Sequence, residues 1–269
     1  MDDDESNVQR EGAEMKQLLV ALLGLYSVAS VAGCVSTSLA GYERVMNAEW
    51  EEGIPAFAGV QGPSTQSISV RRERATGAAM LHVEMNRSDS FSKVANGTPR
   101  AEVSLGAVRF ESGRDYVLEW STLLPVDFKF DIHQPEIITQ IHQGSASGSP
   151  PFALLTYNQH YELNVRSDAK GSLQVFRFGS LPGDLGRQVC WRLHYVPDST
   201  GQSSVTELYK DGVPVYVQHG KGNAYAHDNE AYLKLGIYKW LWFSEPDDIG
   251  SRSMDFGDVA LYRRDANGR

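Results

Sequence analysis

The stretch VTELYKDGVPVYVQ, residues 205–218, is typical of a β-hairpin. Two runs rich in β-branched and aromatic residues flank the dipeptide Asp211-Gly212. This dipeptide suits the positive-φ positions of a tight turn between antiparallel strands. We therefore predict a pair of antiparallel strands in this part of the chain.

The same strand-and-turn pattern covers most of the sequence. From about residue 55 onward, short alternating or β-branched runs recur between clusters of Gly, Pro, Asn, Asp and Ser, such as AEVSLGAVRF, DYVLEWSTLL, EIITQIHQ, YELNVRS and AYLKLGIYKW. No long segment has a helical period, and the sequence contains no internal repeat and no second-domain linker. Many short strands at fairly regular spacing predict one all-β domain, a sandwich or barrel, over residues 55–269.

The beginning of the chain has the character of an export signal. Residues 17–33, QLLVALLGLYSVASVAG, form an apolar run that follows Lys16 and ends in small residues. This is typical of a secretory signal peptide, and the run is at the short limit for a transmembrane helix. The acidic start MDDDESNVQREGAE is unusual before a signal, so we interpret Met15 as the true start. We expect residues 1–33 to be a signal peptide and the protein to be exported.

The cysteines are interpreted together with this signal. Val31-Ala32-Gly33-Cys34 resembles the bacterial lipoprotein box, in which the cysteine is diacylated and becomes the first residue. The resemblance implies lipidation of Cys34, a tether over residues 34–54 and a membrane-anchored protein, at the outer membrane or the periplasmic face. A plain signal peptide with a secreted product, or an uncleaved anchor, is the alternative. The only other cysteine, Cys190, is then expected to be a buried free thiol without a disulfide partner.

Charge and residue spacing exclude several classes of function. The full chain has a net charge of −9, and loss of residues 1–33, which hold six acidic and two basic residues, leaves −5. A mildly acidic protein is a poor non-specific binder of nucleic acid, and it would need a local basic groove to bind a polyanion. The sequence has no HExxH or CxxC motif, so we expect no metal and no cofactor. A monomer is the expected state.

Three predicted strands carry unusual polar rows. Residues two apart share a face of a strand. A solvated face usually carries Lys, Glu, Thr and Ser, whereas these rows contain Arg, Gln, His and Tyr. From the residues alone, a binding face and a solvated face are equally good interpretations. The rows are Arg100, Glu102 and Ser104 in residues 98–105; Gln140 and His142 in residues 137–143; and Tyr232, Lys234 and Tyr238 in residues 232–238.

The three segments resemble, in their order along the chain, the three signature strands of the jelly-roll polysaccharide lyases; the segments read RAE, QIH and YLKLGIY. This group includes alginate lyases, glucuronan lyases and heparin lyase I-like enzymes. The resemblance implies a β-jelly-roll, a lectin-like sandwich of two antiparallel sheets. Ala101, Ser104 and Lys239-Trp240 depart from the alginate lyase pattern. The sequence K-x-G-I-Y before a basic residue is more similar to the heparin lyase I and glucuronan lyase side. The matching positions are Arg100, Glu102, Gln140, His142, Tyr232, Lys234, Gly236 and Tyr238.

The resemblance implies cleavage of a 1,4-linked, uronate-containing polysaccharide by β-elimination, with unsaturated oligosaccharides as products. The uronate could belong to a glucuronan-, glycosaminoglycan- or alginate-like polymer. Such an enzyme removes the C5 proton and expels the C4 oxygen, which requires neutralisation of the adjacent carboxylate. Arg100, Gln140 and His142 are the candidates for holding this carboxylate. Tyr238 would be the general base, the general acid or both, or else His142 is the base and Tyr238 protonates the leaving oxygen.

Other residues are predicted to support substrate binding. Lys234 would bind a neighbouring uronate, with a sugar ring in the gap left by Gly236. Lys239 would add cationic charge near Tyr238. Tyr232 belongs to the same polar row, and Glu102 is expected to orient Arg100 rather than to touch substrate. Aromatic residues after this strand, Trp240, Trp242 and Phe243, would either stack on sugars or pack in the core.

Two rival functions are compatible with a β-sandwich of this composition. A glycoside hydrolase on the same fold needs two carboxylates at close range, and the E-x-D-x-E strand of jelly-roll glucanases is absent. A non-catalytic carbohydrate-binding module or a pseudo-enzyme would keep the sandwich and the aromatic residues. Such a protein has no need to keep Arg100, Gln140, His142 and Tyr238 together, which favours the enzyme.

Overall fold

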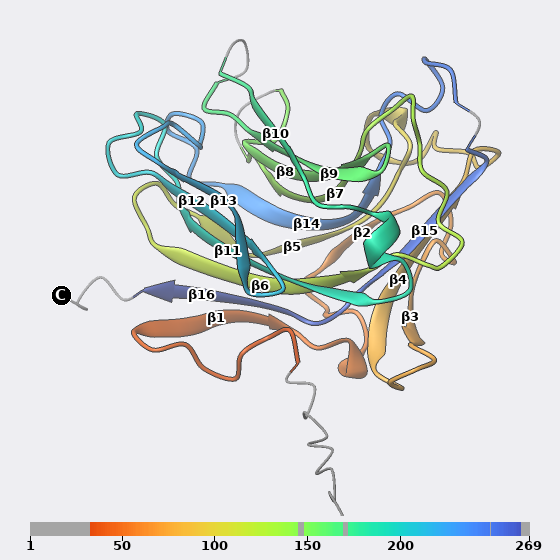
Figure 1. The fold of residues 1–269 in the computed structure, drawn as a ribbon, viewed down its shortest axis with the longest axis horizontal. Coiled ribbons are helices and arrows are strands. Elements are labelled where there is room, and N and C mark those ends of the chain that lie inside the picture. The colour runs from red at the N-terminus through yellow and green to blue at the C-terminus, as the bar shows by residue number, and fades with distance from the viewer. Residues whose placement is uncertain (1–32, 145–147, 169–171, 248, 265–269) are drawn as a thin grey trace, which may run out of the picture. The chain divides into compact units, whose positions relative to one another are not determined.

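Antiparallel strands make up nearly all of the regular structure in the computed structural model, which describes residues 33–144, 148–168, 172–247 and 249–264 (Figure 1). The predicted signal peptide lies outside these residues, except for Gly33. The elements are β1 (Tyr42–Ala48), η1 (Trp50–Glu52), β2 (Gly59–Gln61), β3 (Ile68–Arg72), β4 (Ala79–Asn86), η2 (Ala95–Gly97), β5 (Arg100–Phe110), β6 (Tyr116–Leu123), β7 (Glu136–His142), β8 (Phe152–Tyr157), β9 (His160–Val165), β10 (Gln174–Phe178), η3 (Pro182–Asp184), β11 (Gln188–Val196), β12 (Val205–Lys210), β13 (Val213–His219), β14 (Ala231–Tyr238), β15 (Ser251–Phe256) and β16 (Val259–Arg264).

The strands form two antiparallel sheets (Figure 1). The seven-stranded sheet has the order β10-β9-β8-β7-β14-β5-β2. The nine-stranded sheet has the order β13-β12-β11-β6-β15-β4-β3, with β16 beside β6 and β1 beside β16. The β12–β13 hairpin turns at Asp211 and Gly212, both with positive φ. The prediction of an all-β jelly-roll with two antiparallel sheets is confirmed.

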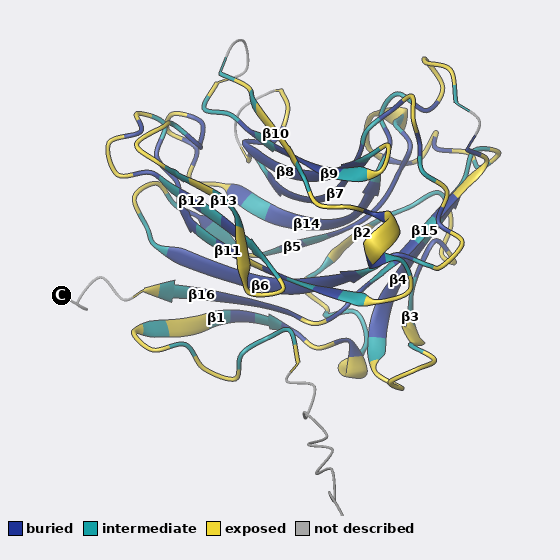
Figure 2. Cartoon of the chain, viewed as in Figure 1, coloured by how far each residue is buried: buried dark blue, intermediate teal, exposed yellow. Residues whose placement is uncertain are grey.

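The core lies between the two sheets and fixes which side chains point outward. Side chains at alternate positions of the inner strands form this core. Strands β6, β7 and β14 are buried over most of their length (Figure 2). In β14, for example, Leu233, Leu235 and Ile237 belong to this core. The period of two along a strand therefore directs Lys234 and Tyr238 to the outer face of the seven-stranded sheet.

The segment predicted as a tether is folded, which corrects the domain boundary. Residues 42–48 form β1, which pairs with the C-terminal strand β16. Trp50 is fully buried, and its indole Nε1 donates a hydrogen bond to the carbonyl of Gly257 at 2.7 Å. A flexible tether would not bury a tryptophan, because burial of a large aromatic side chain removes much apolar surface from water.

Within the described residues, no helix is long and apolar enough to cross a membrane.

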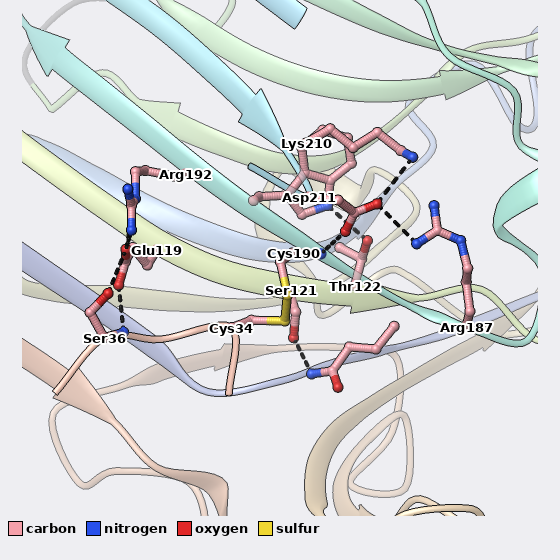
Figure 3. Close-up of a disulfide and its surroundings, with 12 residues drawn as sticks. Cys34, Ser36, Glu119, Ser121, Thr122, Arg187, Cys190, Arg192, Lys210 and Asp211 are labelled. Atoms are coloured by element: carbon pink, nitrogen blue, oxygen red, sulfur yellow. Dashed lines mark hydrogen bonds and ion pairs between the residues drawn. A yellow bond between two sulfur atoms is a disulfide. The ribbon is translucent and has the colours of Figure 1, made fainter. Parts of the chain in front are cut away.

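A disulfide joins Cys34 to Cys190 in β11 (Figure 3). Beside it, the backbone N–H of Ser36 donates to Glu119 at 2.6 Å, and Glu119 also pairs with Arg192 (Figure 3). The prediction that Cys190 is a free thiol is therefore wrong. Lipidation of Cys34 is contradicted as well, because a sulfur atom in a disulfide cannot also carry the thioether of a lipid.

We predict that loss of this disulfide lowers stability. The bond closes a loop between residues 156 positions apart, so it restricts the unfolded chain strongly. Cys190→Ser should reduce the free energy of unfolding by about 2–4 kcal/mol. Thermal unfolding with and without a reducing agent checks this: reduction should lower the melting temperature of the wild type and leave Cys190→Ser unchanged. Two reactive thiols in denatured, unreduced protein would contradict the disulfide.

Candidate active site

The fold places the three polar rows on neighbouring strands. In the seven-stranded sheet, β14 lies between β7 and β5. The register sets Tyr238 opposite Arg100, and Lys234 opposite Gln140. Tyr232 faces His142 in the same way. Rows that are far apart in the sequence thus form one polar surface on the outer face of the sheet.

A groove of about 220 Å³ opens on this surface. Four residues predicted to be catalytic line it together: Arg100, Gln140, His142 and Tyr238. Its floor includes the short side chain of Ala153 in β8, and Trp240 stands beside Tyr238 with ring centroids 5.7 Å apart. The groove therefore combines cationic, amide, imidazole and phenol groups with an aromatic wall.

Gly236 sets the spacing between two of these strands. Its φ is +139°, and a Cβ at this position would lie 2.2 Å from the carbonyl oxygen of Ala101. Any larger residue would push β14 away from β5. The glycine thus permits close backbone approach, and the predicted gap for a sugar ring is taken up by the neighbouring strand.

Glu102 is the centre of a buried hydrogen-bond network beneath the groove. Its Oε2 accepts a hydrogen bond from Lys234 Nζ at 2.6 Å and lies 3.4 Å from Arg100 Nη1. Its Oε1 accepts from Gln140 Nε2 at 2.5 Å. Both Glu102 and Lys234 are only 1% exposed. One carboxylate between two cations leaves a net positive charge, which suits an anionic ligand.

Arg100 and Gln140 keep unused polar atoms at the groove. The Arg100 guanidinium lies 4.0 Å from the centroid of the Tyr238 ring, a cation–π contact. Arg100 Nε and Gln140 Oε1 are buried and have no hydrogen-bond partner among the described residues. Buried polar atoms are nearly always paired in folded proteins, so unpaired atoms at a groove indicate that a ligand completes their bonding.

His142 is prepared to accept a proton. Its Nδ1 donates to the backbone carbonyl of Gln143 at 2.6 Å, so Nε2 carries no hydrogen in the neutral ring. Burial lowers the pKa of His142 below its usual value, and the nearby Lys234 adds to this effect, while the hydrogen bond to Gln143 opposes it. The imidazole is therefore neutral near pH 7.

The family of the chain follows from its sequence. Residues 42–256 match the sequence model of a family described as polysaccharide lyase. The chain belongs to the polysaccharide lyase family. No curated protein sequence matches this lyase.

Solved structures with the same fold are also lyases. The endo-β-1,4-glucuronan lyase from the fungus Trichoderma reesei matches with a TM-score of 0.58 and 14% identity, over 77% of this chain and 94% of its own. The alginate lyase PA1167 from Pseudomonas aeruginosa matches with a TM-score of 0.51 and 17% identity, over 76% and 97%. The alginate lyase A1-II′ of polysaccharide lyase family 7 matches with a TM-score of 0.52 and 15% identity, over 78% of this chain and 96% of its own. At these identities the likeness establishes the fold.

Two lysines predicted to bind substrate are buried and paired in the structure of the lyase. Lys239 is fully buried and forms ion pairs with Asp131 and, at 2.8 Å, with Asp247, so it holds the chain after β14 in place. Lys234 is also buried, and its amine is held by Glu102 and, at 3.2 Å, by Gln61. Sequence alternation placed Lys234 on the correct face, but it does not report how deep a long side chain lies beneath its neighbours.

The remaining predicted residues divide between the groove and its surroundings. Tyr232 lies beside His142, with ring centroids 5.2 Å apart, and it is not part of the groove lining. Of the aromatic residues after β14, Trp240 lines the groove and Trp242 is buried in the core. Phe243 is largely exposed to solvent, and one side of its ring contacts Phe91. Among the described residues, no cluster of three or more His, Cys, Asp or Glu could hold a metal ion.

The groove lining also includes Asn164 and Arg166, which the sequence analysis did not predict. They come from β9 and the position just after it. The run YELNVRS alternates apolar and polar residues, which places Glu162, Asn164 and Arg166 on one face. This alternation was a usable signal, but nothing in the sequence says that β9 lies two strands from β7.

We predict that Glu102→Gln destabilises the protein strongly. The substitution leaves Arg100 and Lys234 buried without a carboxylate, which should lower the free energy of unfolding by about 3–5 kcal/mol. Urea unfolding measures this effect. The matched control is Glu111→Gln, which removes the exposed pair with Arg114 and should change stability little. Equal, small effects of both substitutions would contradict a buried charged network.

We also predict opposite titration behaviour for two histidines. Burial lowers the pKa of His142, whereas the hydrogen bond from His194 to Asp115 raises the pKa of His194. Lowering the pH should therefore protonate His194 first, above the usual value of ~6.5, and His142 only below it. NMR titration of the imidazole signals, assigned with His142→Gln and His194→Gln, checks this order. A reversed order would show that the groove favours a charged imidazole.

Proposed function

We propose that this lyase cleaves a 1,4-linked, uronate-containing polysaccharide by β-elimination and releases unsaturated oligosaccharides. The observation that carries the proposal is the groove itself. It brings Arg100, Gln140, His142 and Tyr238 together above a buried network of net positive charge. The glucuronan and alginate lyases of the same fold, whose names state acidic substrates, support this choice of polymer.

The first task of the groove is to neutralise the uronate carboxylate. Abstraction of the C5 proton places further negative charge on this carboxylate, so donors that bind it lower the barrier. Arg100 offers its unpaired Nε, and Gln140 has a second N–H beside the one given to Glu102. Glu102 fixes both side chains from below and is a positioning residue.

The second task is proton transfer. A base takes the C5 proton, the electron pair of that bond forms the C4–C5 double bond, and the C4–O bond breaks. The leaving oxygen then takes a proton. His142 Nε2 and the Tyr238 hydroxyl are the two groups of the groove suited to these steps. If both protons move on the same face of the sugar, Tyr238 serves twice; if on opposite faces, His142 is the base and Tyr238 the acid.

A hydrolytic mechanism lacks support in the groove. Glycoside hydrolysis needs two carboxyl groups flanking the bond. No Asp or Glu is among the described residues that line this groove. Glu102, the nearby carboxylate, is buried below the surface and committed to Lys234 and Gln140.

We propose further that the protein is exported. The predicted signal peptide motivates this location, and the Cys34–Cys190 disulfide is a second argument, because disulfides form and persist mainly in oxidising compartments.

A direct assay tests the proposed reaction. The protein is incubated with glucuronan, alginate blocks, hyaluronan, heparan sulfate and pectate, and the ultraviolet absorbance of the new C4–C5 double bond is followed. We expect absorbance to rise with one of these polymers. Tyr238→Phe should lower the rate at least about 100-fold, in line with the loss of a general acid or base. The control, Tyr209→Phe, alters a phenol in the other sheet, hydrogen-bonded to Glu207, and should leave the rate unchanged.

The outcomes separate the alternatives. If His142→Asn is as inactive as Tyr238→Phe, the two residues are separate proton-transfer groups. If His142→Asn loses less activity than Tyr238→Phe, Tyr238 acts alone. Binding of a polymer without any absorbance would replace the enzyme with a carbohydrate-binding pseudo-enzyme. New reducing ends without absorbance would indicate hydrolysis.

A further inference from the structure

We propose that Asn164 and Arg166 form a second carboxylate-binding subsite in the groove, which holds a uronate next to the one being cleaved. This inference rests on the proposed function and extends it. It identifies the substrate class as a polymer with uronates at more than one position along the groove, rather than a neutral chain with an isolated uronate.

The register of the sheet places these residues across the groove from the proposed catalytic group. Gln140 in β7 lies opposite Ala153 in β8, and Ala153 lies opposite Asn164 in β9. The backbones of β7 and β9 are therefore about 10 Å apart, two strand spacings. The short Ala153 side chain between them leaves the groove open, so one chain can contact both sides.

The chemistry of the pair matches a uronate: Arg166 has donors for the carboxylate, and Asn164 Oδ1 can accept a hydrogen bond from a hydroxyl group of the same sugar. Arg166 Nε and Asn164 Oδ1 are buried and have no hydrogen-bond partner within the described part of the chain. Arg166 forms no ion pair with a described carboxylate, whereas the nearby Arg177 pairs with Glu162 at 3.0 Å. A guanidinium with free donors binds a carboxylate in a planar, two-bonded geometry, and an adjacent amide group can donate a further hydrogen bond.

The position of Arg166 favours a binding role over a structural one. An arginine that only supports the fold satisfies its donors within the protein, as Arg252 does with Glu136 and the carbonyl of Lys129. Arg166 instead lines the same groove as Arg100, from the opposite side of Ala153. Two cationic groups on opposite sides of the groove suit a polyanion that contacts both.

Kinetics on the polymer that the lyase cleaves test this subsite. Arg166→Ala should raise KM about tenfold or more with little change in kcat, because it removes charge-assisted hydrogen bonds that are equal in the ground and transition states. Asn164→Ala should raise KM less, and Arg166→Lys should recover part of the loss. On oligosaccharides too short to reach β9, wild type and Arg166→Ala should have equal kcat/KM. Arg177→Ala is the matched control and should behave as wild type.

Several results would overturn the subsite. An unchanged KM for Arg166→Ala shows that Arg166 does not contact substrate. A fall in kcat at constant KM assigns it to the chemistry, and a lowered melting temperature that accounts for the lost activity assigns it to the fold. If the wild type gives no absorbance on any polymer, the proposed reaction fails by itself. Calorimetric binding of polyglucuronate to wild type and Arg166→Ala then still tests the subsite, since equal affinities would refute it.

Discussion

The ion pair between Glu102 and Lys234 is the contact on which the groove depends. Both groups are almost completely removed from water, and each gives the other a partner of opposite charge, which offsets the cost of burying them. Burial lowers the pKa of Lys234, and the attraction of Glu102 opposes that effect. With Lys234 holding one oxygen, Glu102 can still accept from Gln140 and attract Arg100. The pair thereby converts two flexible side chains into fixed donors at the groove surface.

The backbone makes this pair possible. Close approach of β14 to β5 at Gly236 brings Lys234 within reach of Glu102, and the absence of a Cβ is what allows that approach. Behind this layer, the core side chains of β14 pack between the sheets and fix the strand in depth. A one-residue slip of β14 would exchange its polar and apolar faces, so the register of the core and the chemistry of the groove are determined together.

Much of this arrangement was predictable from the sequence, because the period of two in each strand is a local property. Arg100, Gln140, His142 and Tyr238 were placed on one surface from three such strands and a family resemblance, and the structure brings them into one groove. What failed depended on contacts between distant segments. The burial of Lys239 by Asp131, the pairing of Cys34 with Cys190 and the position of β9 beside the groove are set by tertiary packing, which local patterns do not encode.

The contrast between the acidic chain and its cationic groove follows from where the charges lie. The net charge is −9 for the full sequence and −5 without the predicted signal peptide, so the chain as a whole has no general attraction for polyanions. Near the groove, Arg100 and Lys234 share the single carboxylate of Glu102, and Arg166 has none among the described residues. Surface charges are screened over about 10 Å of salt solution, whereas partly buried charges are screened much less. The local excess of positive charge at the groove therefore attracts an acidic polysaccharide. The net negative charge of the rest of the chain disfavours binding of the polymer elsewhere.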